Sequence, residues 1–154
     1  MNICVIPARG GSKRIPRKNI KEFQGEPIIA YSIKIALESK YFDRVIVSTD
    51  DDEIASVAEK YGAEVPFKRP CDLSNDFIGV EEVIDHAVKY IENEGKRCKY
   101  VCTLLATAPL LQKHYLIQGY EELKNSEAIN SFSATSMPFP IQRSFKLTKE
   151  GRCK

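Results

Sequence analysis

Short apolar runs of β type alternate along the chain with segments whose apolar residues recur at helical spacing. The β-type runs cover residues 2–6, 44–48, 64–67, 99–105 and 129–135. The helical patterns cover residues 26–40, 52–61, 80–94 and about 116–123, the last interrupted by Gly119. Strands that alternate with helices are typical of a parallel sheet. We therefore predict an α/β fold with a mostly parallel sheet and helices on both faces.

The length and charge of the chain exclude several classes of protein. Its 154 residues can bury one substantial core, and no apolar run approaches the length that crosses a bilayer. The 23 Lys and Arg against 21 Asp and Glu are too balanced for a protein whose main partner is nucleic acid. Five cysteines without a CxxC pair indicate reduced thiols, and the N-terminus lacks the order of a secretory signal. We expect a single cytoplasmic domain over residues 1–154, with no membrane and no nucleic acid among its partners.

The loop after the first predicted strand carries the clearest functional signal. Gly10 and Gly11 allow the backbone to approach a ligand, and Ser12 adds a hydroxyl donor. Cations without any carboxylate fill the surrounding segment: Arg9, Lys13, Arg14, Arg17, Lys18 and Lys21. This composition suits a polyphosphate bound beyond the carboxyl end of a strand. The segment has neither GxxxxGK[ST] nor GxGxxG, and a solvated basic loop is the alternative, but glycines directly after a strand favour a ligand cradle.

Five collinear segments resemble a known family. They read IPARGGSKRIPRKNI, GEPIIAYSI, FDRVIVSTDDDEIA, YGAEVPFKRP and ATAPL. In this order they resemble the cytidylyltransferases that activate nine-carbon acidic sugars, most strongly as far as Pro109. The resemblance implies a Rossmann-like sheet of the nucleotide-diphospho-sugar transferase type. It also implies transfer of CMP from CTP to the anomeric hydroxyl of a sugar acid, with release of pyrophosphate and with Mg²⁺ as cofactor.

The resemblance also implies roles for individual residues. Lys18 and Arg9 are expected to be catalytic, because phosphoryl-type transfer depends on positioning and on neutralising developing charge. Asn19 is expected to contact polar groups of the nucleotide, and Arg69 the base or phosphate side of the pocket. The full expected nucleotide-binding set is Ala8, Arg9, Gly10, Gly11, Ser12, Lys13, Lys18, Asn19, Arg69, Asp76, Ala106 and Thr107.

The later part of the chain bears on the sugar and the metal. Residues 105–109 read LATAP where sialate synthetases typically carry Gln-Pro-Thr-Ser-Pro, so pseudaminic acid is the favoured substrate, with sialic, legionaminic or deoxy-octulosonic acid as alternatives. Gln142 and Arg143 are expected to meet the sugar carboxylate. No Asp follows Thr135, so we expect no metal ligands within the chain and a missing C-terminal portion. A full-length member would be a homodimer, and a truncated, non-catalytic nucleotide-binding module is the alternative.

Two acidic positions have two interpretations each. Asp50 ends a predicted strand and is placed to assist metal or ribose binding, but capping of the next helix by residues 50–53 is the favoured interpretation. Asp76 follows a proline-containing loop and either contacts the ligand or fixes a turn.

Overall fold

The computed structural model describes residues 1–136 of the chain. Contacts within the chain divide it into two units, one over Met1–Gln118 and one from Gly119 onward, and each is described by itself. The first unit holds the sheet and every described residue of the predicted site. The single domain expected over residues 1–154 stays a prediction. None of the helices over the described residues is long and apolar enough to span a membrane.

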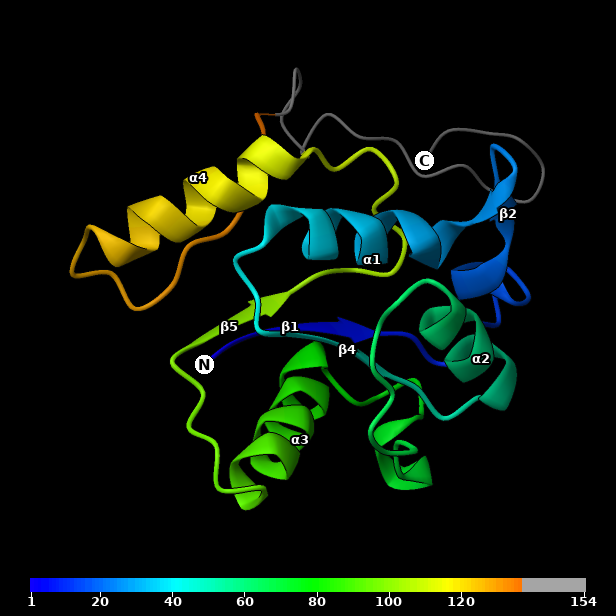
Figure 1. The fold of residues 1–154 in the computed structure, drawn as a ribbon. Helices are drawn as coiled ribbons and strands as arrows, with labels where there is room; N and C mark the ends of the chain where they lie inside the picture. The colour runs from blue at the N-terminus through cyan, green and yellow to red at the C-terminus, as the bar shows by residue number, and fades with distance from the viewer. Residues whose placement is uncertain (137–154) are drawn as a thin grey trace, which may run out of the picture. The chain divides into compact units, whose positions relative to one another are not determined.

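A three-stranded parallel sheet forms the centre of the first unit (Figure 1). Its strands are β1 (Asn2–Pro7), β4 (Arg44–Ser48) and β5 (Tyr100–Thr103), in the order β4-β1-β5. The register places Cys4 opposite Val45 of β4 and opposite Cys102 of β5. The strand that comes first in the chain therefore lies in the middle of the sheet.

The strand predicted over residues 64–67 forms only isolated bridges beside β4. The bridges join Glu64 to Ile46 and Lys68 to Thr49, both in parallel. Pro66 lies between them and has no N–H to donate, so a continuous ladder cannot run through this segment. The prediction of a full third strand is wrong for this reason, although the segment does lie along the edge of β4.

Helices cover both faces of the sheet, as predicted. Helices α1 (Ile28–Ser39) and α2 (Asp52–Lys60) pack on one face, and α3 (Val80–Asn93) lies against the other (Figure 1). All three begin within two residues of the positions that their apolar spacing predicts. This confirms the α/β class with a parallel sheet between helices.

The alternation of side chains along β1 divides the interior into two cores. Successive residues of a strand point to opposite faces of the sheet. Cys4 and Ile6 pack with side chains of α1 and α2, whereas Ile3 and Val5 pack with Ala87 of α3. All four β1 side chains are 0% exposed, so the strand is hydrophobic on both faces, as expected for the centre of a parallel sheet.

A short hairpin that the sequence analysis missed precedes α1. Strand β2 (Glu22–Phe23) pairs antiparallel with β3 (Glu26–Pro27). The turn between them places Gln24 and Gly25 at φ values of 48° and 87°, which suits a two-residue hairpin loop. Because β3 takes up the residues where the helix was predicted to begin, α1 starts at Ile28.

Helix α4 (Lys113–Lys124) runs through Gly119 without the predicted interruption. The strand predicted over residues 129–135 is wrong, because the described part of this segment has no strand structure. Its apolar side chains are exposed, Ile129 at 95% and Phe132 at 82%. Apolar content alone does not make a strand, since a strand is stabilised by pairing with a neighbour.

Candidate functional site

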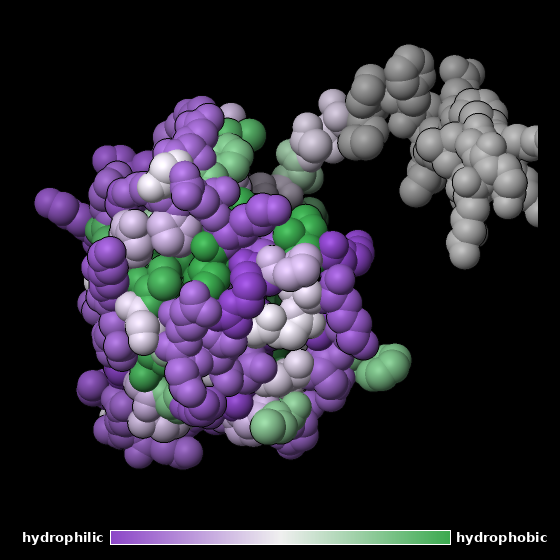
Figure 2. Space-filling view, turned by 90° about the vertical axis from the view of Figure 1, so that its right-hand side faces the viewer, coloured by the Kyte–Doolittle hydropathy of each residue, from purple (hydrophilic) through white to green (hydrophobic). Residues whose placement is uncertain are grey.

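The glycine loop, residues 8–19, leaves β1 at the carboxyl end of the sheet. Ala8 is 0% exposed, and its N–H donates to the carbonyl oxygen of Ser48 at 2.9 Å, which ties the start of the loop to the end of β4. This end of the strands faces the viewer in Figure 2, where hydrophilic surface predominates. The loop therefore lies at the edge of the sheet where α/β proteins bind ligands.

Asp50 connects the glycine loop to Arg69. Its Oδ1 accepts a hydrogen bond from the N–H of Gly10 at 3.0 Å and lies 3.5 Å from Nη2 of Arg69. The Arg69 side chain is only 3% exposed, and its Nε donates to Oγ of Ser74 at 3.1 Å. Burial lowers the pKa of Arg69, and the Asp50 charge opposes this shift. The result is a buried, fixed positive charge linked to the backbone of the loop.

Asp51, and not Asp50, caps α2. Oδ1 of Asp51 accepts hydrogen bonds from the N–H groups of Glu53 and Ile54 at 3.1 and 3.0 Å. Arg17 from the glycine loop pairs with the same carboxylate at 2.5 Å and also pairs with Glu53. The hydrogen bond from Arg17 lowers the pKa of Asp51. The capping interpretation is thus confirmed for Asp51, while Asp50 holds the loop instead.

The two glycines of the loop have different surroundings. A Cβ on Gly10 would lie 2.6 Å from Oδ2 of Asp51, closer than side chains tolerate. A Cβ on Gly11 would meet no atom of residues 1–136 within 4 Å. Gly10 is therefore required for packing of the loop against the start of α2, whereas Gly11 leaves open space that a ligand can occupy. The N–H of Ser12 donates back to the Gly10 carbonyl at 2.9 Å.

One carboxylate neutralises two cations of the glycine loop. Asp76 pairs through Oδ1 with Arg9 and through Oδ2 with Lys13, each at 2.5 Å. These hydrogen bonds, that from Lys13 first, lower the pKa of Asp76. The turn at this point is made by Asn75, whose Oδ1 accepts from the N–H of Phe77 at 2.8 Å. The structure therefore brings Asp76 to the predicted site, and Asn75 makes the turn that was the other interpretation of Asp76.

Lys18 and Asn19 lie in the short helix η1 (Lys18–Ile20) at the end of the loop. Asn19 is 6% exposed, and its Nδ2 donates to the carbonyl oxygen of Arg9 at 2.9 Å. Its amide thus holds the two ends of the loop together. Lys18 is half-buried, and no carboxylate among residues 1–136 forms an ion pair with it. Its charge is therefore available to a ligand.

The remaining predicted residues follow β5 or lie beyond the described chain. Ala106 is 3% exposed with its side chain in the core, so only its backbone can face a ligand, and Thr107 is half-buried. The segment is held by Ser32, whose Oγ donates to the carbonyl oxygen of Leu105 at 2.8 Å. The predicted sugar-binding residues lie outside the described part of the chain: Gln142 and Arg143.

The carboxylates around the loop do not fit a metal cage. Within residues 1–136, no group of three or more His, Cys, Asp or Glu side chains is placed to hold a metal ion. Asp50, Asp51 and Asp76 are each engaged by an arginine of this site. The expectation of Mg²⁺ stays a prediction.

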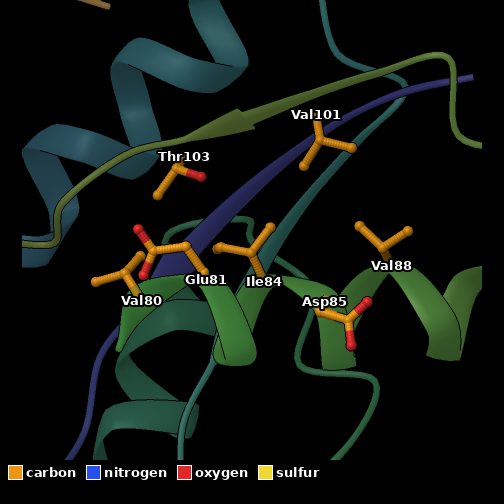
Figure 3. A pocket seen from close by; sticks show the side chains of 7 residues that line it. All are labelled: Val80, Glu81, Ile84, Asp85, Val88, Val101 and Thr103. Atoms are coloured by element: carbon orange, nitrogen blue, oxygen red, sulfur yellow. The ribbon is translucent and has the colours of Figure 1, made fainter. Parts of the chain in front are cut away.

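A hollow of about 500 Å³ lies elsewhere, between α3 and the edge strand β5 (Figure 3). It is lined by Val80, Glu81, Ile84, Asp85, Val88, Val101 and Thr103. This lining is apolar and acidic, with no cation to receive a phosphate, and it includes none of the predicted site residues. The glycine loop therefore remains the candidate site for an anionic ligand.

Comparisons with known proteins show the family of the chain. A family model described as cytidylyltransferase matches residues 3–145. A pseudaminic acid cytidylyltransferase of Campylobacter jejuni serotype O:2 is 48% identical over 151 residues, covering 98% of this chain and 65% of that protein. A CMP-N,N'-diacetyllegionaminic acid synthase of the same organism is 47% identical over 108 residues, covering 70% of this chain and 46% of that protein. The chain thus spans about two thirds of the length of the first of these relatives.

The fold itself has solved counterparts. The chain matches a CMP:2-keto-3-deoxy-manno-octonic acid synthetase, solved in complex with CTP, with a TM-score of 0.66 and 22% identity. The match covers 83% of this chain and 49% of that structure. At this identity the match supports the Rossmann-like fold alone.

Proposed function

Because this chain belongs to the cytidylyltransferase family, we propose that its glycine loop binds the triphosphate of CTP and that the complete protein transfers CMP to a nine-carbon acidic sugar. The observation that carries the proposal is the loop itself. It offers open space at Gly11, a cation at Lys18 that pairs with no carboxylate of residues 1–136, and two further cations at Arg9 and Lys13. All of them follow the central strand of a parallel sheet, which is a place where such folds bind nucleotides.

The proposed reaction is a displacement at phosphorus. The anomeric oxygen of the sugar attacks the α-phosphorus of CTP and loses its proton to solvent, and the bond from that phosphorus to the α–β bridging oxygen breaks. Pyrophosphate leaves with the electron pair. Negative charge grows on the leaving group, so positioned cations lower the barrier more than covalent participation would. We assign this role to Lys18 and Arg9, while Lys13 and the donors at Gly10, Gly11 and Ser12 hold the triphosphate.

The supporting residues complete the proposed pocket. Asn19 fixes the carbonyl of Arg9 and thereby the shape of the loop. Arg69, buried and tied to Asp50, is proposed to face the base or the phosphates. Pseudaminic acid is the proposed sugar, because the relative with 48% identity over 98% of this chain is named for it. Legionaminic acid is the second candidate, since a named synthase for it is 47% identical over a shorter stretch.

Thermal protection tests nucleotide binding. CTP at about a hundred times its dissociation constant should add about 2.7 kcal/mol to the free energy of unfolding, whereas ATP, GTP and UTP at the same concentration should add less. Lys18→Ala should lose most of this protection. Lys21→Ala is the matched control, because Lys21 is an exposed lysine of the same segment. Absence of protection by every nucleotide would refute the proposal.

Transfer is measured separately from binding. Release of pyrophosphate from CTP should depend on addition of the sugar acid, with pseudaminic acid giving the highest rate. Binding of CTP without any sugar-dependent release would instead favour the non-catalytic nucleotide-binding module.

A further inference from the structure

Asp76 occupies the position of an anion between two cations of the glycine loop. One carboxylate oxygen meets Arg9 and the other meets Lys13, both at 2.5 Å. A phosphate group offers the same arrangement, two oxygens on one centre between two positive groups. The loop is thus partly neutralised by a carboxylate of its own chain.

We infer that Asp76 competes with the polyphosphate for Arg9 and Lys13, so that residues 74–79 form a latch which nucleotide binding releases. The inference rests on the proposed function, since it requires a polyphosphate ligand at the glycine loop.

The latch is anchored firmly at its base. Arg69 donates to Oγ of Ser74 at 3.1 Å, and the same hydroxyl donates to the carbonyl oxygen of Pro70 at 2.9 Å. Asp50 joins Arg69 to the N–H of Gly10. These contacts do not involve Asp76, so they remain when its carboxylate leaves.

Residues 75–78, the tip of the latch, are joined to the glycine loop by the ion pairs of Asp76. Oδ1 of Asn75 accepts from the N–H groups of Phe77 and Ile78 at 2.8 and 3.2 Å, so the tip is ordered by its own turn. The Phe77 side chain is 97% exposed and adds no apolar packing. Among the residues that the structure describes, the hydrogen bonds and ion pairs between this tip and the glycine loop are those of Asp76 with Arg9 and Lys13. Release of the tip therefore breaks no part of either core.

Electrostatics favours replacement of the Asp76 carboxylate by a polyphosphate at Arg9 and Lys13. The Asp76 and Arg9 side chains are each 33% exposed and Lys13 is 83% exposed, and ion pairs in such positions are weak. A triphosphate brings several negative charges and more acceptor oxygens than a single carboxylate. Once it is bound to Arg9 and Lys13, it repels Asp76. This repulsion between the triphosphate and the Asp76 carboxylate sets nucleotide binding against the closed latch.

Asp76→Asn measures the competition directly. A latch that is closed nine-tenths of the time weakens binding about tenfold, so this variant should bind CTP up to about tenfold more tightly than the unaltered chain. Asp72→Asn is the matched control, because it removes one negative charge from the same loop without touching the ion pairs. Equal or weaker CTP binding by Asp76→Asn would overturn the latch.

A fluorescent reporter follows the latch itself. The chain contains no tryptophan, so Phe77→Trp introduces a single emitter at the exposed tip. Titration with CTP or inorganic tripolyphosphate should change its emission, and the change should disappear when Asp76→Asn is added. If CTP protects the chain but does not change the emission of Phe77→Trp, and if Asp76→Asn binds CTP with unchanged affinity, the latch is overturned and the proposed function stands. No binding of either ligand to any variant would overturn both.

Discussion

The contrast between the two adjacent glycines gives the sharpest test of the site's architecture. In Gly10→Ala, the new Cβ would meet Oδ2, Cβ and Cγ of Asp51 at 2.6, 2.9 and 3.1 Å. Asp51 cannot yield easily, because two helix N–H groups and Arg17 hold its carboxylate. In Gly11→Ala the new Cβ meets nothing within 4 Å in the described part of the chain. Both changes restrict the unfolded chain to the same extent, so the difference between the two variants isolates the clash.

The expected difference follows from two costs. Forcing a methyl group into a packed site costs about 1–3 kcal/mol, and loss of a helix cap costs about 1 kcal/mol. If the loop shifts to keep the cap, only the first applies. We therefore expect Gly10→Ala to be less stable than Gly11→Ala by about 1–4 kcal/mol, which corresponds to a melting temperature lower by about 3–12 °C for a chain of this size.

Urea unfolding followed by circular dichroism, together with thermal melts, measures this difference. Both variants should retain the secondary structure of the unaltered chain. Equal stability of the two variants, or a greater loss in Gly11→Ala, would refute the packing of the glycine loop against the start of α2.

Three further predictions follow from particular contacts. Asp51→Ala should lower the free energy of unfolding by about 1–2 kcal/mol through loss of the cap, whereas Asp52→Ala, at a side chain that is 86% exposed, should change it by less than about 0.5 kcal/mol in the same urea titration. The hydrogen bond from Arg17 lowers the pKa of Asp51. The stability that this carboxylate contributes is therefore full above its unfolded pKa and is lost as the pH falls through its folded pKa. The free energy of unfolding, measured between about pH 5 and pH 2, should depend less on pH in Asp51→Asn than in the unaltered chain. Ser32→Ala should cost about 1 kcal/mol in thermal or urea unfolding, because it removes the buried donor to the carbonyl of Leu105, and an unchanged melting temperature would contradict that role.

The sequence predicts the parts of this fold that depend on local pattern. The apolar run of β1 and the spacing of α1, α2 and α3 predict the sheet and its two covering layers. The segment with Pro66 and the segment around Ile129 were predicted as strands because their residues are of β type. Ladder formation depends on a free N–H and on a neighbouring strand, and apolar spacing reports neither. The hairpin before α1 was missed because two-residue strands leave no period to detect.

The candidate site, too, could be predicted from the sequence only in part. Glycines and cations after a strand are visible in the sequence, and they suffice to predict the glycine loop. The partners of these residues are not visible, because they come from elsewhere in the chain. Asp50 and Asp51 are adjacent and chemically identical, yet one holds Gly10 and the other caps α2. An acidic residue directly after the strand that neighbours β1 was the available signal for Asp50, since both strands end at the same edge.

The central place of β1 has a consequence for how the chain reaches this structure. Both edges of β1 are paired, one with β4 and the other with β5, and its two faces contribute to separate cores. Pairings between segments so distant along the chain are slow to form, because a long loop must close first. During synthesis, the first strand to emerge keeps one edge unpaired until Tyr100–Thr103 has followed it. We therefore expect nascent chains that stop before β5 to be prone to aggregation.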